Sequence, residues 1–173
     1  MDVPPPLEPE STDVVFEGPK FRVEVQRFRG GVRRDVVRHP GACAAVVLVG
    51  DDGVLLVRQR REAVGRVTLE VPAGTYDVPG ETPEDAMRRE IREETGHRVT
   101  RLEHLGSILT TPGFTDERID LFLAWAHAHG DPQEPGVKPQ TMPLSEAIAA
   151  ARSGSIEDAK SVIALLRAAD RVG

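Results

Sequence analysis

The acidic residues Glu90, Glu93 and Glu94 have the type and spacing of a cation-binding group. They lie three and four positions apart, so on a helix their side chains share one face. Like charges held close together are costly unless a cation compensates them. Because hard divalent ions prefer oxygen ligands, an all-carboxylate group predicts a site for Mg²⁺, with Mn²⁺ as the alternative.

A helix that carries these glutamates is predicted by local signals at both ends. Thr82 supplies a hydroxyl for the N-terminal cap, and Pro83 suits the first helical position. Gly96 suits a C-terminal cap. We therefore expect a helix from about Pro83 to Thr95.

The apolar residues of this helix decide which way the glutamates point. They are Ala86, Met87 and Ile91, and they must face the core. At about 100° per residue, Glu90 and Glu94 project between these apolar positions. We expect carboxylates on or beside the buried face. The alternative is a solvated acidic helix stabilised by its own arginines: Arg88, Arg89 and Arg92.

The segment from Gly74 to His97 resembles the Nudix hydrolase signature, G-x5-E-x7-R-E-U-x-E-E-x-G-U, in which U is a bulky apolar residue. It departs twice: six residues, not five, separate Gly74 from Glu81, and His97 stands at an apolar position. The extra residue falls in a loop, where insertions are tolerated, and we expect His97 to begin the next strand. The matching residues are Glu81, Arg89, Glu90, Ile91, Glu93, Glu94 and Gly96.

Other segments are similar to the ADP-ribose pyrophosphatase branch of that family. Pro112 falls fifteen residues after His97, where a proline is associated with ADP-ribose specificity. Segment 34–39 matches less well, because Arg38 replaces a usual acid. The resemblance implies an α/β fold, the Nudix α/β/α sandwich with a mixed β-sheet, and Mg²⁺-dependent hydrolysis of ADP-ribose to AMP and ribose 5-phosphate. The similar segments are 57–61, 69–74, 111–117 and 154–160.

The metal ligands and the catalytic base follow from the motif and the resemblance together. Glu90 and Glu94 are the first-choice ligands, and Glu93 shares or completes the group. The resemblance adds the backbone carbonyl of Ala73 as a ligand. It also implies a base from the acidic loop 131–138, where Glu134 is the main candidate. Glu93 and Glu117 are the alternatives.

Substrate-binding residues are implied by the same resemblance. Arg61 resembles an arginine that contacts substrate phosphate or ribose, with a plain surface arginine as the alternative. Pro112 and Glu117 belong to the loop similar to the family's S-P-G-F-S/T-D-E segment. Arg33 and Arg34 could reach the substrate across a dimer, or lie on a solvated hairpin face.

Length and composition bound the classes of protein that this chain can belong to. With 173 residues and 39% hydrophobic content, it fits one folded domain. A net charge of −6 argues against general nucleic-acid binding. No apolar run approaches a membrane span, and no signal segment is visible. The single cysteine, Cys43, lies in an apolar run and predicts a buried thiol, so we expect a cytoplasmic setting.

Along the chain, three regions are predicted. Residues 1–13 are expected to form a flexible tail. Residues 14–40 form an arginine-rich β-hairpin region, with strands at 21–28 and 32–37, which needs a partner surface and predicts a homodimer. Residues 41–173 form the Nudix domain. Its expected strands are 42–49, 54–59, 67–71, 98–110 and 119–128, its later helices are 144–152 and 156–171, and 129–143 is expected to be a polar loop.

Two other functions remain open from the sequence. One is hydrolysis of another nucleoside diphosphate derivative, such as a nucleotide sugar or FAD. The other is a catalytically silent Nudix-like domain that binds a nucleotide as a sensor. A silent domain should have lost motif acids, whereas all of them are present here. An enzyme acting on a small nucleoside diphosphate compound is therefore the favoured interpretation.

Overall fold

The structure is a computed structural model, and it describes residues 7–172. The chain divides into two compact units. The first comprises Met1–Pro40 and Leu109–Arg118, and the second comprises Gly41–Ile108 and Ile119–Gly173. Each unit is described by itself.

The first unit contains a three-stranded antiparallel sheet in the order β1-β2-β3. The strands are β1 (Ser11–Glu17), β2 (Arg22–Phe28) and β3 (Val32–Arg38). The hairpin expected from the sequence is formed by β2 and β3. Its turn is the short 3₁₀ segment Arg29–Gly31, where Gly30 and Gly31 have φ angles of 81° and 79°. β1 begins inside the segment 1–13 that was expected as a tail, and residues 1–6 of that segment lie outside the described residues.

The segment 109–118 joins this unit through β3. Val37 N donates to Phe114 O at 2.8 Å, and Asp116 N donates to Val37 O at 3.3 Å. Arg38 bridges Asp116 and the buried carboxylate of Glu24, at 3.1 and 2.8 Å. The expected loop around Pro112 is therefore fastened to the end of β3.

The second unit is built on a mixed seven-stranded sheet in the order β10-β5-β4-β9-β8, with β6 pairing with β5 and β7 with β4. β4 and β9 are parallel, whereas β5 pairs antiparallel with its neighbours. A second 3₁₀ turn, Glu62–Val64, lies between β5 and β6. The strands are β4 (Ala42–Val49), β5 (Gly53–Arg61), β6 (Arg66–Glu70), β7 (Ala73–Thr75), β8 (His97–Leu109), β9 (Arg118–Ala128) and β10 (Val137–Pro143).

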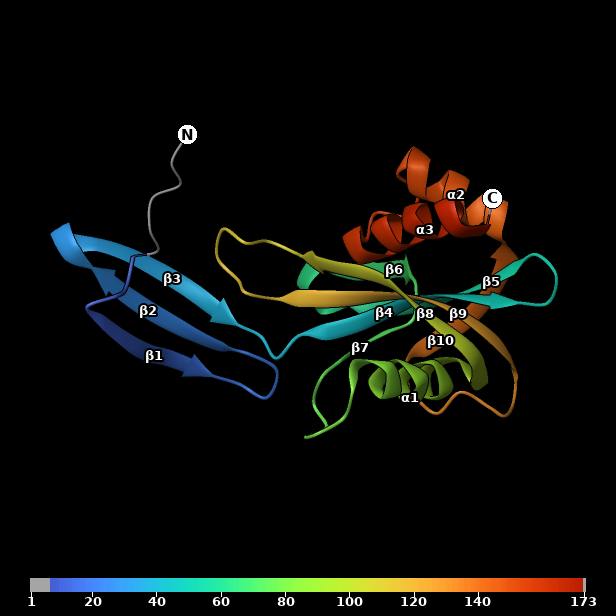
Figure 1. Cartoon of the computed structure of the whole chain (residues 1–173), viewed down its shortest axis with the longest axis horizontal. Coiled ribbons are helices and arrows are strands. Elements are labelled where there is room, and N and C mark those ends of the chain that lie inside the picture. The colour runs from blue at the N-terminus through green and yellow to red at the C-terminus, as the bar shows by residue number, and fades with distance from the viewer. Residues whose placement is uncertain (1–6, 173) are drawn as a thin grey trace. The chain divides into compact units, whose positions relative to one another are not determined.

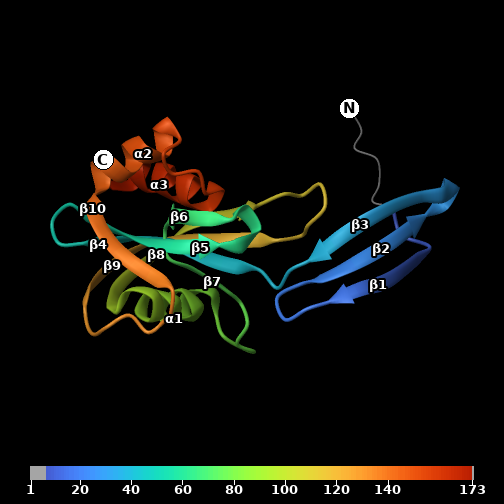
Figure 2. The same cartoon turned by 180° about the vertical axis from the view of Figure 1, so that it is seen from behind.

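Helices cover both faces of this sheet (Figure 1 and Figure 2). α1 (Pro83–Thr95) lies on one face, where Met87 and Ile91 pack with Phe122. α2 (Leu144–Ser153) and α3 (Ala159–Val172) lie on the other face, where Leu165 packs with Leu56. β4 contributes buried side chains to both layers, as its continuous apolar sequence predicts. The α/β/α sandwich and its mixed sheet are confirmed.

One prediction in this unit was wrong. Residues 129–143 do not form a loop throughout, because β10 pairs in full register with β5 at the edge of the sheet. Pro139 and Pro143 removed the usual strand signal. Proline is tolerated in an edge strand, since one side of the strand needs no ladder hydrogen bonds. The short strand β7, directly after Pro72, was also not predicted.

Candidate active site

α1 forms over the predicted residues, with the predicted caps. The Thr82 hydroxyl accepts a hydrogen bond from Asp85 N at 3.1 Å, and Pro83 opens the first turn. Gly96 adopts the left-handed conformation with φ 71°, and its N–H donates to Arg92 O at 2.9 Å. The register of the glutamates on the helix is therefore fixed from both ends.

Two of the three motif glutamates are buried. Glu90 is 7% exposed and Glu94 is 3% exposed, whereas Glu93 is half-buried. They lie beside the apolar residues Met87 and Ile91, which are fully buried. The prediction of carboxylates on the buried side of the helix is confirmed, and the solvated acidic helix is wrong.

Glu94 points at the backbone of Ala73. Its Oε2 accepts a hydrogen bond from Ala73 N at 3.0 Å. Burial, together with the nearby charges of Glu134 and Glu90, raises the pKa of Glu94 to about 8, against the opposing effect of the Ala73 hydrogen bond. A buried carboxyl with this pKa lacks a sufficient compensating cation among the protein's own groups.

Glu90 is held by the neighbouring Arg89. Arg89 Nη1 donates to Glu90 Oε1 at 2.6 Å. Burial nevertheless raises the pKa of Glu90 above its ordinary value, because the Arg89 contacts only partly offset the desolvation and Glu93 and Glu134 add negative charge. The charge of Glu134 therefore raises the pKa of both Glu90 and Glu94, and the charge of Glu90 also raises that of Glu94.

The glycine before the motif loop allows this arrangement. A Cβ atom on Gly74 would lie 1.9 Å from Cδ and 2.1 Å from Oε1 of Glu90. Only glycine lets the β7 backbone approach the carboxylate so closely. Glycine at position 74 therefore leaves the space that the Glu90 carboxylate occupies.

Arg89 also ties the helix to the loop before it. Its Nε and Nη2 donate to the two oxygens of Glu81 at 3.0 and 2.9 Å. Arg89 and Glu81 therefore form a charge pair that holds α1 to the loop before it. The residue inserted before Glu81 has not disturbed this pair, since the extra length is taken up in the exposed loop.

The loop that carries Glu134 is fastened to the end of α1. Gln133 N and Glu134 N donate to Glu93 O at 2.7 and 3.1 Å. His129 N and Gly130 N donate to Gly96 O at 3.0 and 2.9 Å. These bonds bring Glu134, the candidate base, to the same end of the helix as the motif glutamates.

The donor set fits a hard divalent cation by its chemistry. It consists of carboxylates only, and two of them are buried with raised pKa values. The Glu90 carboxylate accepts a hydrogen bond from Arg89, and the Glu94 carboxylate accepts one from Ala73 N. Within residues 7–172, no three histidine, cysteine, aspartate or glutamate side chains are arranged around one point as a metal site.

Sequence reasoning missed a buried ion-pair network beside this site. Arg61 donates to both oxygens of Glu70 at 2.8 and 2.7 Å. Lys160 at the start of α3 contacts the same carboxylate and also Asp158, at 2.9 Å from the latter. Burial alone would raise the pKa of Glu70, but the Arg61 and Lys160 contacts lower it to about 2.

Only part of this network had a local signal in the sequence. Glu70 is an acid within the strand predicted at 67–71, and the structure leaves it 2% exposed, so it needs a partner. Arg61, expected to be either a substrate contact or a plain surface arginine, donates two hydrogen bonds to Glu70 and is therefore not a free surface side chain.

The remaining candidate residues belong to the first unit. Arg33 pairs with Asp35 at 2.9 Å, and Arg34 donates to Arg33 O at 2.9 Å; both arginines are exposed in β3. Glu117 accepts a hydrogen bond from Thr110 at 2.8 Å and lies 3.7 Å from His39. Pro112 lies in the same exposed loop. These residues remain candidates for substrate binding.

Cys43 is fully buried beneath the site, as predicted. Its Sγ lies 3.7 Å from Gly74 O, to which the thiol donates. Burial, together with the charge of Glu90, raises the pKa of the thiol to about 12. Cys43 is therefore a protonated core residue and has no catalytic role. None of the helices described is long and apolar enough to cross a membrane.

Comparison with known proteins identifies related sequences across most of the chain. A protein named methanol dehydrogenase activator from Bacillus methanolicus is 33% identical over 163 residues, covering 89% of this chain and 88% of that protein. An ADP-ribose pyrophosphatase from Mycobacterium tuberculosis is 38% identical over 122 residues, covering 68% of this chain and 59% of the enzyme. A GDP-mannose pyrophosphatase from Cronobacter sakazakii is 35% identical over 151 residues, covering 76% and 78%.

A solved structure has the same fold. The crystal structure of an ADP compounds hydrolase superposes with a TM-score of 0.82, covering 99% of this chain and 97% of that chain at 23% identity. The family model described as the NUDIX domain matches residues 38–168, which include every motif residue discussed above. The chain therefore belongs to the Nudix family.

Proposed function

We propose that this Nudix protein hydrolyses the pyrophosphate bond of ADP-ribose and releases AMP and ribose 5-phosphate. The observation that carries the proposal is the pair of buried carboxylates, Glu90 and Glu94, held against the Ala73–Gly74 backbone. Burying such a pair costs stability unless a cation offsets the charge. The complete set of motif acids favours catalysis over a silent sensor.

Glu90, Glu93, Glu94 and the Ala73 carbonyl would hold the cation, Mg²⁺ or alternatively Mn²⁺. A bound ion of this kind neutralises the charge of a pyrophosphate and lowers the pKa of a water molecule. The protein supplies the orientation. Glu94 is fixed by Ala73 N, and Glu90 is fixed between Arg89 and Gly74.

Glu134 is the proposed general base. The water oxygen bonds to one phosphorus, its proton passes to a Glu134 carboxylate oxygen, and the bond from that phosphorus to the bridging oxygen breaks. The bridging oxygen leaves with the other phosphate. The backbone bonds from Gln133 and Glu134 to Glu93 O support this assignment, because they hold residue 134 close to α1 and its motif acids. Glu93 and Glu117 remain the alternatives for this role.

Arg61 is the proposed phosphate or ribose contact in the same unit, because it is oriented by two hydrogen bonds to Glu70, a carboxylate that Lys160 also contacts. Arg33, Arg34, Pro112 and Glu117 are proposed as further substrate contacts. Arg33 and Arg34 would act across a homodimer formed through the first unit. We propose a cytoplasmic setting, in which the single thiol stays reduced.

A second candidate substrate is a nucleotide sugar, because a GDP-mannose pyrophosphatase is among the relatives. One assay separates the candidates. ADP-ribose, GDP-mannose, other nucleotide sugars and FAD are incubated with the protein and Mg²⁺, and products are separated by ion-exchange chromatography. We expect ADP-ribose to give AMP with the highest kcat/KM. A higher kcat/KM for GDP-mannose would transfer the function to nucleotide sugars, and no product from any compound would refute the hydrolase proposal.

A further inference from the structure

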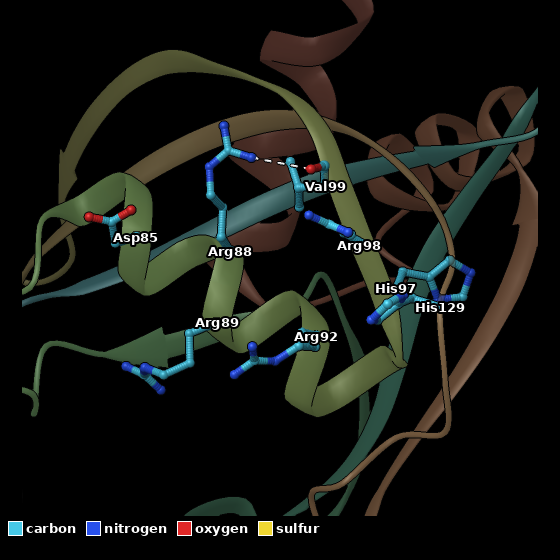
Figure 3. Close-up of a pocket in the computed structure, with 8 residues that line it drawn as sticks. All are labelled: Asp85, Arg88, Arg89, Arg92, His97, Arg98, Val99 and His129. Carbon is cyan, nitrogen blue, oxygen red and sulfur yellow. Dashed lines mark hydrogen bonds between the residues drawn. The ribbon is translucent and has the colours of Figure 1, made fainter.

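A basic pocket lies beside α1 (Figure 3). Its volume is about 430 Å³, within the range of small-molecule sites. α1, the start of β8 and the turn after β9 line it. The lining residues are Asp85, Arg88, Arg89, Arg92, His97, Arg98, Val99 and His129.

Of the four arginines of this pocket, Arg89 is paired with Glu81 and Glu90, whereas Arg88, Arg92 and Arg98 have few partners within residues 7–172. Arg88 donates only to Val99 O, at 3.3 Å, and the side chain of Arg98 makes no hydrogen bond or ion pair with any residue in 7–172. The nearest carboxylate to Arg92 is that of Glu93, at 3.8 Å. The carboxylate of Asp85 accepts a hydrogen bond from Thr82 at 2.8 Å. Positive charge therefore gathers here on a chain whose net charge is −6.

Two histidines also line the pocket, His97 and His129. His97 Nδ1 lies 2.8 Å from Thr95 O, and because a carbonyl only accepts, Nδ1 carries the hydrogen. His129 is exposed. Guanidinium groups bind phosphate oxygens through paired hydrogen bonds, so the arginines are the expected phosphate contacts.

We propose that this pocket is a second anion site, which binds a phosphate-bearing small molecule of the nucleotide or sugar-phosphate class. Its proposed phosphate contacts, Arg88 and Arg98, are bonded to none of the motif glutamates within residues 7–172, whereas Arg89, which also lines the pocket, is paired with Glu90. Arg88 and Glu90 lie two residues apart, so they point about 200° apart around the helix. Arg88 and Arg98 come from different elements and provide the main contacts to the phosphate.

A ligand in this pocket also touches the support of the Glu134 loop. His129 lines the pocket, and its backbone N–H is bonded to Gly96 O, as is that of Gly130. Four residues after Gly130, the backbone N–H of Glu134 donates to Glu93 O. A ligand that orders His129 therefore orders the loop as far as Glu134. The bearing of this effect on catalysis rests on the proposed role of Glu134, whereas binding itself does not.

The test measures binding without turnover. The full-length protein is titrated calorimetrically with inorganic pyrophosphate and, separately, with ADP, in EDTA and 150 mM salt. The variants are Arg88→Gln/Arg98→Gln and a control, Arg152→Gln/Arg171→Gln, at exposed positions of α2 and α3. We expect the dissociation constant to rise at least about tenfold in the first variant, because two charge-assisted contacts are lost. The control should bind like the wild type.

Hydrogen exchange on the same samples measures how strongly the amides of the loop 129–134 are protected. Pyrophosphate should slow exchange at the amides of residues 129–134 in the wild type and in Glu94→Gln, but not in Arg88→Gln/Arg98→Gln. Equal affinity in the wild type and that double variant would overturn the proposal. So would binding that disappears at 150 mM salt, or binding of only an acidic polypeptide or RNA. These binding results can be interpreted even if the protein shows no activity in the hydrolase assay.

Discussion

Gly74 and Glu90 are in contact at a distance that excludes any side chain at residue 74: a Cβ would lie 1.9 Å from the Glu90 Cδ. The Gly74→Ala variant should therefore push the Glu90 carboxylate out of place. A displacement of about 1 Å near a reacting group can cost roughly 10²-fold in rate. We expect kcat to fall by about that factor, measured by AMP release from ADP-ribose.

A matched glycine serves as the control. A Cβ on Gly130 would meet nothing within 4 Å, so Gly130→Ala should keep near-normal turnover. If Gly74→Ala were as active as Gly130→Ala, the position of Glu90 would not matter for the reaction.

Glu94→Gln and Glu90→Gln should each remove most of the Mg²⁺-dependent activity, with the fold retained. The amide keeps the size of the side chain but loses the negative charge that would hold the cation. The check is steady-state turnover across a Mg²⁺ titration, with circular dichroism to verify the fold. Near-normal turnover in either variant would remove that residue from the metal site.

Glu94→Gln should also change how metal-free stability depends on pH. The folded pKa of Glu94, about 8, lies above its ordinary value of 4.5. Stability of the wild type in EDTA should therefore fall as pH rises from 4.5 and level off above about 8. Glu94→Gln lacks this loss, so it should exceed the wild type by a few kcal/mol at pH 9 and match it near pH 4. Urea denaturation at both pH values measures the difference, and parallel curves would contradict the buried charge.

Glu134→Gln should lower kcat by about 10²- to 10⁴-fold with little change in KM, as expected for a lost general base. The side chain keeps its size, and the backbone bond from residue 134 to Glu93 O does not depend on the carboxylate. A pH–rate profile of wild type and variant provides the measurement. Wild-type turnover would move the role to Glu93 or Glu117.

The Glu70 network predicts a specific loss of stability in acid. The pKa of Glu70 is about 2 in the fold against an ordinary 4.5, so its contribution is complete above about pH 5 and is lost as pH falls towards 2. The difference corresponds to roughly 3 kcal/mol. Glu70→Gln should therefore be less stable than the wild type at pH 7, and the gap should narrow below pH 4. Thermal melts at both pH values test this, and a constant gap would disagree with it.

The exposed apolar residues of β1 predict self-association through the first unit. Val14, Val15 and Phe16 are each more than half exposed, which is unusual for adjacent residues in a strand without a partner. Phe16→Glu should convert a homodimer into a monomer in multi-angle light scattering. Val64→Glu, at an exposed apolar residue of the second unit, is the control. A wild-type monomer would rule out the homodimer and the proposed role of Arg33 and Arg34 across it.

α1 and β4 could be predicted from the sequence because their signals are local. Thr82, Pro83 and Gly96 mark the ends of α1 within its own segment, and eight consecutive apolar residues mark β4. The burial of Glu90 and Glu94 followed from helical geometry alone. Local patterns of this kind survive folding because few competing contacts act on them.

What was missed depends on residues far apart in the chain. Lys160 and Glu70 are ninety positions apart, so no local pattern links them. β10 forms because β5 offers an open edge, although its prolines indicate a loop. The clamp from Gln133 to Glu93 O uses backbone atoms, which carry no sequence signal. Tertiary pairing, not propensity, determines these features.

The burial of Cys43 has a practical consequence for spectroscopy. Because this one thiol is enclosed, protonated and the only cysteine in the chain, maleimide and methanethiosulfonate reagents should leave it untouched under native conditions. Cysteines introduced at exposed residues of β1 and α3 would then accept fluorophores or spin labels selectively in the otherwise natural sequence. Distances between such labels would reveal how the two units are oriented in solution and whether substrate changes that orientation.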